Sequence, residues 1–121
     1  MKIIELVDKV KKGETTARAQ VERSLAKAQE TEEYHALLSL TAERALQRAD
    51  EIDEQVKNGE NPGVLAGVPF VVKDNYLAFG APTTAAAKML ENFQAPVQAT
   101  VVEKLEAALT QIGRASCRER V

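Results

Sequence analysis

The amino-acid sequence predicts a helix-rich α/β fold with a single domain. Apolar residues recur at helical spacing over most of residues 3–57, whereas a nearly continuous apolar run of strand length lies at residues 65–72. The composition is 45% apolar and 28% charged, which is typical of a chain that folds into a globular domain. A length of 121 residues suffices for one domain with a hydrophobic core and is too short to expect two.

Two helices are predicted at the N-terminus, and together they are expected to form a helical hairpin. The first covers residues 3–11 and stops at Gly13. The second begins after Thr15 or Thr16, either of which can cap it. The residues expected to be buried are Ile3, Ile4, Leu6, Val7 and Val10 in the first helix and Ala19, Val21, Leu25 and Ala28 in the second.

The next segment, Tyr34 to Leu40, is short and apolar, and a strand is favoured over a helix end. Thr41 is expected to cap a third helix that runs to about Lys57. Residues 57–63 are rich in turn formers and end that helix. Its buried side should consist of Ala42, Ala45, Leu46, Ala49, Ile52 and Val56.

A buried strand is predicted at residues 65–72. Because proline cannot donate to a strand ladder, Pro69 should begin the paired section or lie on an edge. A turn follows at residues 80–84, and the small residues 85–90 predict the start of a helix. Thr100 and Glu103 fit a capping box that would open a last helix carrying Val101, Val102, Leu105 and Leu109.

Charge and residue content exclude several classes of function. The formal net charge of −2 gives no basic surface for direct nucleic-acid binding. No apolar run is long enough for a signal peptide core or a membrane span, so a cytoplasmic protein with no membrane association is expected. Cys117 has no second cysteine to pair with, and with the lone His35 it offers too few ligands for zinc.

The stretch GVPFVVKDN places Lys73 directly after a buried-type strand. From the residues alone, a solvated lysine at the strand end followed by a turn at Asp74 and Asn75 is the favoured interpretation. The alternative is a catalytic base, which requires apolar surroundings that favour the neutral amine.

Other polar residues are weaker candidates for a site. His35 is interpreted as a strand-edge or core histidine. Thr83 and Thr84 fit turn and cap positions, and Ser24 and Ser39 lack the Gly-flanked elbow that exposes a nucleophile. A charged, solvated helical face is predicted for Asp50, Glu51, Asp53 and Glu54.

The segments LAGVPFVVKDN and GAPTTAAAKMLENFQAPVQATVVEKL resemble the amidase signature family. Within that family they are most similar to the A subunits of bacterial tRNA-dependent amidotransferases. The resemblance runs from Met1 to Leu109, loosely over the first helices and tightly from Leu65 onward. It implies an α/β fold with a mixed central sheet covered by helices. Residues 1–110 are then expected to be the N-terminal part of a truncated amidase domain.

The resemblance also implies a role for Lys73, as the base of a Ser-cisSer-Lys triad that hydrolyses glutamine. The ammonia would pass to a partner B subunit, where ATP and Mg are implied, and a C subunit would complete the complex. Glutamyl-tRNA(Gln) or aspartyl-tRNA(Asn) would be met only through that complex, and no cofactor is expected in this chain. Both serines of the triad are absent from the 121 residues, so this chain alone is expected to be inactive.

The last residues depart from the resemblance. Residues 112–121 are encoded in frame by a string that looks like a widely used sequencing-library adapter, whose next codon is a stop. Residues 111–121 are therefore predicted to be a non-native tail. A frayed basic end, an arginine-rich RNA contact and a reactive Cys117 are the alternatives.

Two other functions remain open. One is a stand-alone amidase of the same family that acts on small amides. The other is a non-catalytic helical interaction module, in which the N-terminal helices bind a partner and Lys73 is merely solvated.

Overall fold

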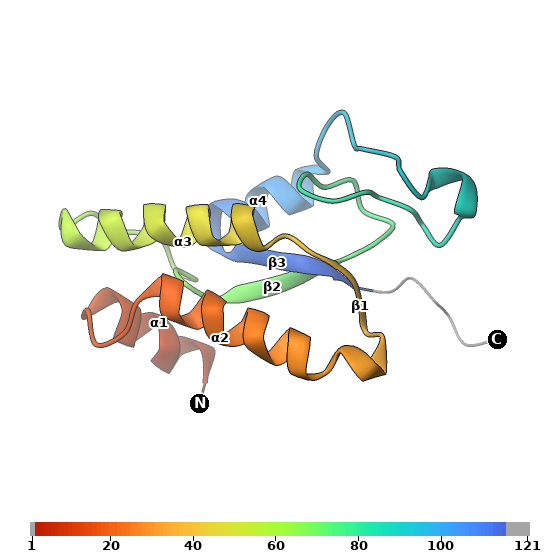
Figure 1. Ribbon diagram of the computed structural model, residues 1–121. Coiled ribbons are helices and arrows are strands. Elements are labelled where there is room, and N and C mark those ends of the chain that lie inside the picture. The colour runs from red at the N-terminus through yellow and green to blue at the C-terminus, as the bar shows by residue number, and fades with distance from the viewer. Residues whose placement is uncertain (1, 116–121) are drawn as a thin grey trace.

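The computed structural model describes residues 2–115 and shows an α/β fold with a small mixed sheet (Figure 1). The strands are ordered β1-β3-β2, with β3 in the centre, antiparallel to β1 and parallel to β2. The predicted fold class is thus confirmed. The elements are α1 (Ile3–Lys11), α2 (Ala17–Glu30), a 3₁₀ turn (Glu32–Tyr34), β1 (Leu37–Leu40), α3 (Ala42–Lys57), β2 (Pro69–Lys73), a second 3₁₀ turn (Lys88–Leu90), α4 (Thr100–Ala108) and β3 (Thr110–Ala115).

Helices α2 and α3 run antiparallel and side by side across the sheet (Figure 1). They share one core cluster with α1 and β3, whose buried members are Val10, Ala17, Val21, Leu25, Ala45, Ala49, Ile52, Ala66 and Ile112. The predicted hairpin of the first two helices is wrong, because the buried stripe of α2 matches the alanine-rich stripe of α3 and packs on that helix instead.

The buried faces of the first two helices differ from those predicted. Helix α1 buries only Val7 and Val10, whereas Ile3 and Ile4 are 56% and 74% exposed because its first turn extends past the core. In α2 the alanine facing the core is Ala17 and not Ala19, because Ala17, Val21 and Leu25 are spaced four residues apart on one helical face. Thr16 caps the helix by accepting a hydrogen bond from the Ala19 amide at 3.0 Å.

Three expectations about residues 34–57 have mixed outcomes. The strand at 34–40 is confirmed for Leu37–Leu40, and the predicted third helix is confirmed as α3. The interpretation of His35 is wrong. It ends the first 3₁₀ turn with a left-handed φ of 49° and is exposed, so it lies neither in the core nor on a strand edge.

Strand β2 begins at Pro69, as expected for a proline that cannot donate to the ladder. Residues 65–67, predicted as strand, form a turn instead. The helix predicted from residue 85 is also wrong, since Ala85 and Ala86 have left-handed φ values and only Lys88–Leu90 form a 3₁₀ turn.

The capping box predicted for the last helix is wrong as well. Ala99 is the N-cap residue of α4, and Thr100 is already its first helical residue. The helix packs Val102 against Val72 of β2 and Ala78, in a cluster separate from that of α2 and α3.

Strand β3 crosses the predicted boundary between residues 110 and 111. A β-carbon on Gly113 would lie 2.6 Å from the Ser39 carbonyl oxygen, so the close approach of β1 requires glycine there. Residues 116–121 lie outside the described residues, and the adapter origin of residues 111–121 stays a prediction. Within residues 2–115, no helix is long and apolar enough to cross a membrane.

Candidate active site at the end of strand β2

Lys73 is the last residue of β2 and is exposed. Side chains alternate along a strand, and its neighbours Val72 and Asp74 point inward with exposed fractions of 5% and 1%. The backbone of Lys73 pairs with Ala115 of the central strand. The lysine therefore projects from the carboxyl end of a parallel strand pair, with its ammonium group accessible.

Asp74, directly after the lysine, is buried and tied to a residue ten positions later. Its carboxylate accepts a hydrogen bond from the Thr84 amide at 3.1 Å and another from the Thr84 hydroxyl. Its carbonyl oxygen accepts the Ala85 amide at 3.0 Å. A buried carboxylate is costly unless it is hydrogen-bonded, and Thr84 provides those bonds. Asp74 thus joins the strand end to the segment 84–87.

The segment 84–87 forms a tight turn. Ala85 and Ala86 have φ values of 48° and 59°, which are unusual for residues with a β-carbon. The Ala86 amide donates to the Thr84 hydroxyl oxygen at 3.3 Å and the Ala87 amide to the Thr84 carbonyl at 2.8 Å. The interpretation of Thr84 as a turn residue is confirmed.

Thr83 has the same kind of role. It is 4% exposed, its amide donates to the Phe93 carbonyl at 2.9 Å, and its hydroxyl donates to the Tyr76 carbonyl at 3.4 Å. The paired threonines thus hold the loop between β2 and α4, residues 74–99, onto itself.

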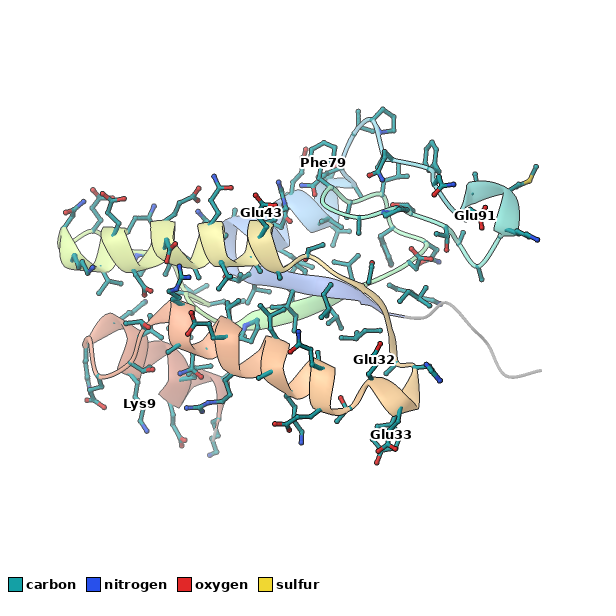
Figure 2. All side chains as sticks on the ribbon, viewed as in Figure 1. Lys9, Glu32, Glu33, Glu43, Phe79 and Glu91 are labelled. Atoms are coloured by element: carbon teal, nitrogen blue, oxygen red, sulfur yellow. The ribbon has the colours of Figure 1, made fainter. Side chains whose placement is uncertain are left out.

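The β2–α4 loop is also fastened to the helices. The Phe79 amide donates to Gln98 Oε1 at 3.0 Å, and Gln98 Nε2 donates to Glu106 Oε2 of α4 at 2.8 Å. The Arg44 guanidinium of α3 lies 5.7 Å from the centre of the Phe79 ring. In Figure 2, Phe79 accordingly lies near the start of α3, where Glu43 is labelled.

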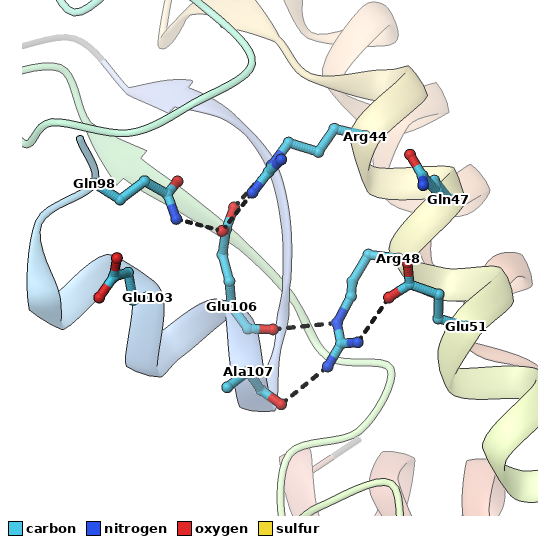
Figure 3. A pocket seen from close by; sticks show the side chains of 8 residues that line it. All are labelled: Arg44, Gln47, Arg48, Glu51, Gln98, Glu103, Glu106 and Ala107. Carbon is cyan, nitrogen blue, oxygen red and sulfur yellow. Dashed lines mark hydrogen bonds and ion pairs between the residues drawn. The ribbon is translucent and has the colours of Figure 1, made fainter. Parts of the chain in front are cut away.

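A groove of about 480 Å³ lies between α3 and α4 (Figure 3). Its cations are engaged: Arg44 pairs with Glu106, while Arg48 donates to the Glu106 carbonyl at 3.2 Å and the Ala107 carbonyl at 3.0 Å. The hydrogen bond to Glu106 raises the pKa of Arg44, against the opposing effect of burial. The side chains of this groove therefore link α3 to α4 and stabilise their packing.

The acidic face of α3 is exposed at Asp50, Glu51 and Glu54, as predicted, whereas Asp53 is partly buried. Asp53 accepts hydrogen bonds from the Ala17 amide at 2.7 Å and the Arg18 amide at 3.1 Å, and so caps α2. Asp50 pairs with Arg18, and the hydrogen bond between them raises the arginine pKa. Glu51 pairs with Arg48 of its own helix. Among the described residues, no group of three or more His, Cys, Asp or Glu side chains could hold a metal ion.

The structure brings no described serine to the lysine. Ser24 lies on α2, and Ser39 lies on β1 with the central strand between it and β2. The backbones of β1 and β2 are therefore roughly 10 Å apart. Ser116 and Cys117 lie outside the described residues.

Sequence reasoning missed the burial of Asp74. The signal was available, since Asp74 follows Val72 by two positions and so falls on the inward face if the strand periodicity continues. Its partner Thr84 carried no such signal, because it lies ten positions further along an irregular loop.

Comparison with known families and proteins gives consistent matches. The family model described as Amidase matches residues 19–119. The A subunit of glutamyl-tRNA(Gln) amidotransferase from Thermoanaerobacter pseudethanolicus is 42% identical over 119 residues, which is 97% of this chain and 24% of that protein. The protein of the same name from Gloeobacter violaceus is 53% identical over 74 residues, 61% of this chain and 15% of that protein. The chain thus spans a quarter or less of the length of these relatives.

Solved structures match the fold. A structure described as a vestigial protein complex that reveals the evolutionary origins of an s-triazine catabolic enzyme has a TM-score of 0.90 and 32% identity, over 95% of this chain and 26% of that one. The peptide amidase from Stenotrophomonas maltophilia has a TM-score of 0.88 and 25% identity, over 95% of this chain and 24% of the enzyme.

Proposed function

This chain belongs to the amidase family, and we propose that it forms the lysine-bearing part of the A subunit of a bacterial tRNA-dependent amidotransferase. The observation that carries the proposal is Lys73 of the KDN motif, which projects from the end of β2 beside a buried aspartate. The identity with relatives named as the A subunit of glutamyl-tRNA(Gln) amidotransferase supports the assignment within the family.

In the proposed reaction Lys73 acts as a base in its neutral form, which requires apolar surroundings that the rest of the full-length protein would supply, since Lys73 is exposed in this chain. It accepts a proton, through a bridging serine, from a nucleophilic serine whose oxygen attacks the carboxamide carbon of glutamine. The carbon–nitrogen bond breaks, ammonia leaves with the transferred proton, and water then releases glutamate from the acyl-enzyme. Both serines would come from a Gly/Ser-rich segment that these 121 residues do not contain.

The proposal also assigns partners. Ammonia passes to a B subunit, which binds ATP and Mg and amidates glutamate or aspartate on misacylated tRNA, and a C subunit completes the cytoplasmic complex. The net charge of −2 gives this chain no basic surface for tRNA, so tRNA contacts are assigned to the other subunits.

A stand-alone amidase acting on small amides is the second candidate. The TM-score of 0.88 with the Stenotrophomonas maltophilia peptide amidase favours it, although the identity is only 25%. The two candidates differ in their need for partner subunits.

Recovery of the gene around the sequence encoding this chain tests the proposal. A downstream Gly-Ser-Ser-Gly-Gly-Ser segment is expected, whereas a natural stop near residue 121 would favour a non-catalytic helical interaction module. The encoded protein should hydrolyse glutamine with its B and C subunits, and Lys73→Ala should abolish that activity. Turnover of small amides without partners would favour the stand-alone amidase.

The 121-residue chain alone should not hydrolyse glutamine, because a base without its nucleophile cannot form an acyl-enzyme. Glutamine turnover by the purified chain, with contaminating enzyme excluded by the Lys73→Ala variant, would contradict this expectation.

A further inference from the structure

We infer that Asp74 is a positioning residue for Lys73: its buried carboxylate, acting through Thr84, fixes the backbone that follows the lysine and so sets the direction of the ammonium group. The inference rests on the proposed role of Lys73 as a base. Asp74 lies directly after the end of β2, so the strand ladder does not fix its position.

The backbone before Lys73 is fixed by the sheet. Lys73 pairs with Ala115 of β3, and Val72 is buried in the cluster that contains Val102 of α4. The strand ladder ends at Lys73, the last residue of β2. The chain then turns, and the Tyr76 amide donates a hydrogen bond to the Lys73 carbonyl at 3.1 Å. Whatever holds the next residue therefore determines the remaining freedom of the lysine backbone.

That next residue is anchored by its own side chain. The Asp74 carboxylate is 1% exposed and accepts bonds from both the amide and the hydroxyl of Thr84. The Asp74 carbonyl accepts a hydrogen bond from the Ala85 amide, so both the side chain and the main chain of Asp74 bind the turn at residues 84–87. Such bonds to a carboxylate are stronger than bonds between neutral groups.

The turn that Asp74 grips does not hold its shape by local preference. Ala85 and Ala86 both have the left-handed backbone conformation, which is unfavourable for residues with a β-carbon. Surrounding contacts must therefore impose it. Without the Asp74 carboxylate, the turn can relax, and the strand end loses the support on the C-terminal side of Lys73.

The test uses the 121-residue chain and measures how fast an amine-acylating reagent modifies Lys73 relative to Lys9 of α1, by peptide mass analysis at fixed pH. The variants are Asp74→Asn and Thr84→Val, with Thr84→Ser retaining the hydroxyl. Asp53→Asn is the matched control, because that carboxylate also accepts two hydrogen bonds but caps α2 far from Lys73 in the sequence.

Asp74→Asn and Thr84→Val should each change the Lys73 to Lys9 ratio by at least about threefold, since the local structure around Lys73 loosens. Thr84→Ser, which retains the hydroxyl, should keep the Lys73 to Lys9 ratio of the unmodified sequence. Asp53→Asn should lower the melting temperature and leave the ratio unchanged. Amide hydrogen exchange at Ala85, whose amide binds the Asp74 carbonyl, should accelerate in the first two variants only.

An unchanged Lys73 to Lys9 ratio in Thr84→Val would overturn the inference. A change in Asp53→Asn as large as that in Asp74→Asn would also overturn it, because it would show that the ratio reports only a general loss of stability. If Asp74→Asn does not fold, Thr84→Val and Thr84→Ser decide. Neither readout involves amide hydrolysis. Absence of glutamine hydrolysis by the assembled subunits would therefore refute the proposed function and leave the labelling result standing.

Discussion

Arg44 of α3 and Glu106 of α4 are joined by two hydrogen bonds, from Nε at 3.2 Å and from Nη2 at 2.8 Å. The glutamate side chain is only 15% exposed and also accepts a bond from Gln98. This one carboxylate therefore connects both helices to the end of the β2–α4 loop, and it is the first target for mutation (Figure 3).

Glu106→Ala should lower the free energy of unfolding by about 1–2 kcal/mol, because a partly buried, charge-assisted network loses its acceptor. Urea unfolding of Glu106→Ala, Arg44→Met and the double variant should give a coupling energy of about 1 kcal/mol. Glu103→Ala is the control, since Glu103 lines the same groove but is exposed. Strictly additive single changes would contradict the network.

Asp53→Ala should destabilise the protein by about 1–2 kcal/mol, the usual effect of removing a helix N-cap acceptor. Its carboxylate accepts the amides of Ala17 and Arg18, the first two residues of α2. Glu54→Ala, at an exposed neighbouring position, should change stability by less than about 0.5 kcal/mol. Equal effects of the two changes in thermal unfolding would contradict the capping role.

Ala86→Gly should be more stable than Ala87→Gly by about 1 kcal/mol. Ala86 has a φ of 59°, where glycine relieves the β-carbon clash, whereas Ala87 has a φ of −99°, where glycine only adds freedom to the unfolded chain. Denaturant titration of both variants measures the difference, and the opposite order would rule out the left-handed turn in solution.

Thr110→Val and Thr83→Val form a matched pair. The Thr110 hydroxyl is buried and has no hydrogen-bond partner among the described residues, so its replacement should be neutral or stabilising by up to about 1 kcal/mol. The Thr83 hydroxyl donates to the Tyr76 carbonyl, so its loss should cost about 1 kcal/mol. A destabilised Thr110→Val would show that its hydroxyl is hydrogen-bonded in solution.

The first three helices could be predicted from the sequence because their signals are local. Val7 and Val10 follow helical spacing, Thr16 is a cap residue, and the alanines of α3 mark its buried stripe. The pairing of α2 with α3 could not be predicted, since periodicity shows which face is buried but not the neighbour that covers it.

The predictions failed where distant groups decide the local structure. Ala85 and Ala86 have good helix propensity, but Asp74 holds the preceding threonine and the turn overrides that preference. The capping box failed for a related reason, because the chain enters α4 through Ala99, whose amide donates to the Leu77 carbonyl and sets the start of the helix.

The candidate site likewise has one part that the sequence predicted and one part that it did not. The position of Lys73 at a strand end followed from the residue pattern, and its proposed chemistry came from the family resemblance. The anchoring of Asp74 by Thr84 was absent from the prediction, since it depends on how the loop folds back.

The central position of β3 has a consequence for the order of events during synthesis. Strands β1 and β2 do not pair with each other, and both wait for residues 110–115, which the ribosome makes last of the three. At typical translation rates the interval between β2 and β3 is roughly a few seconds. During that interval β1 and β2 have no sheet partner among residues 2–115, so chaperone binding to segments 37–40 and 69–73 should be strongest before β3 emerges.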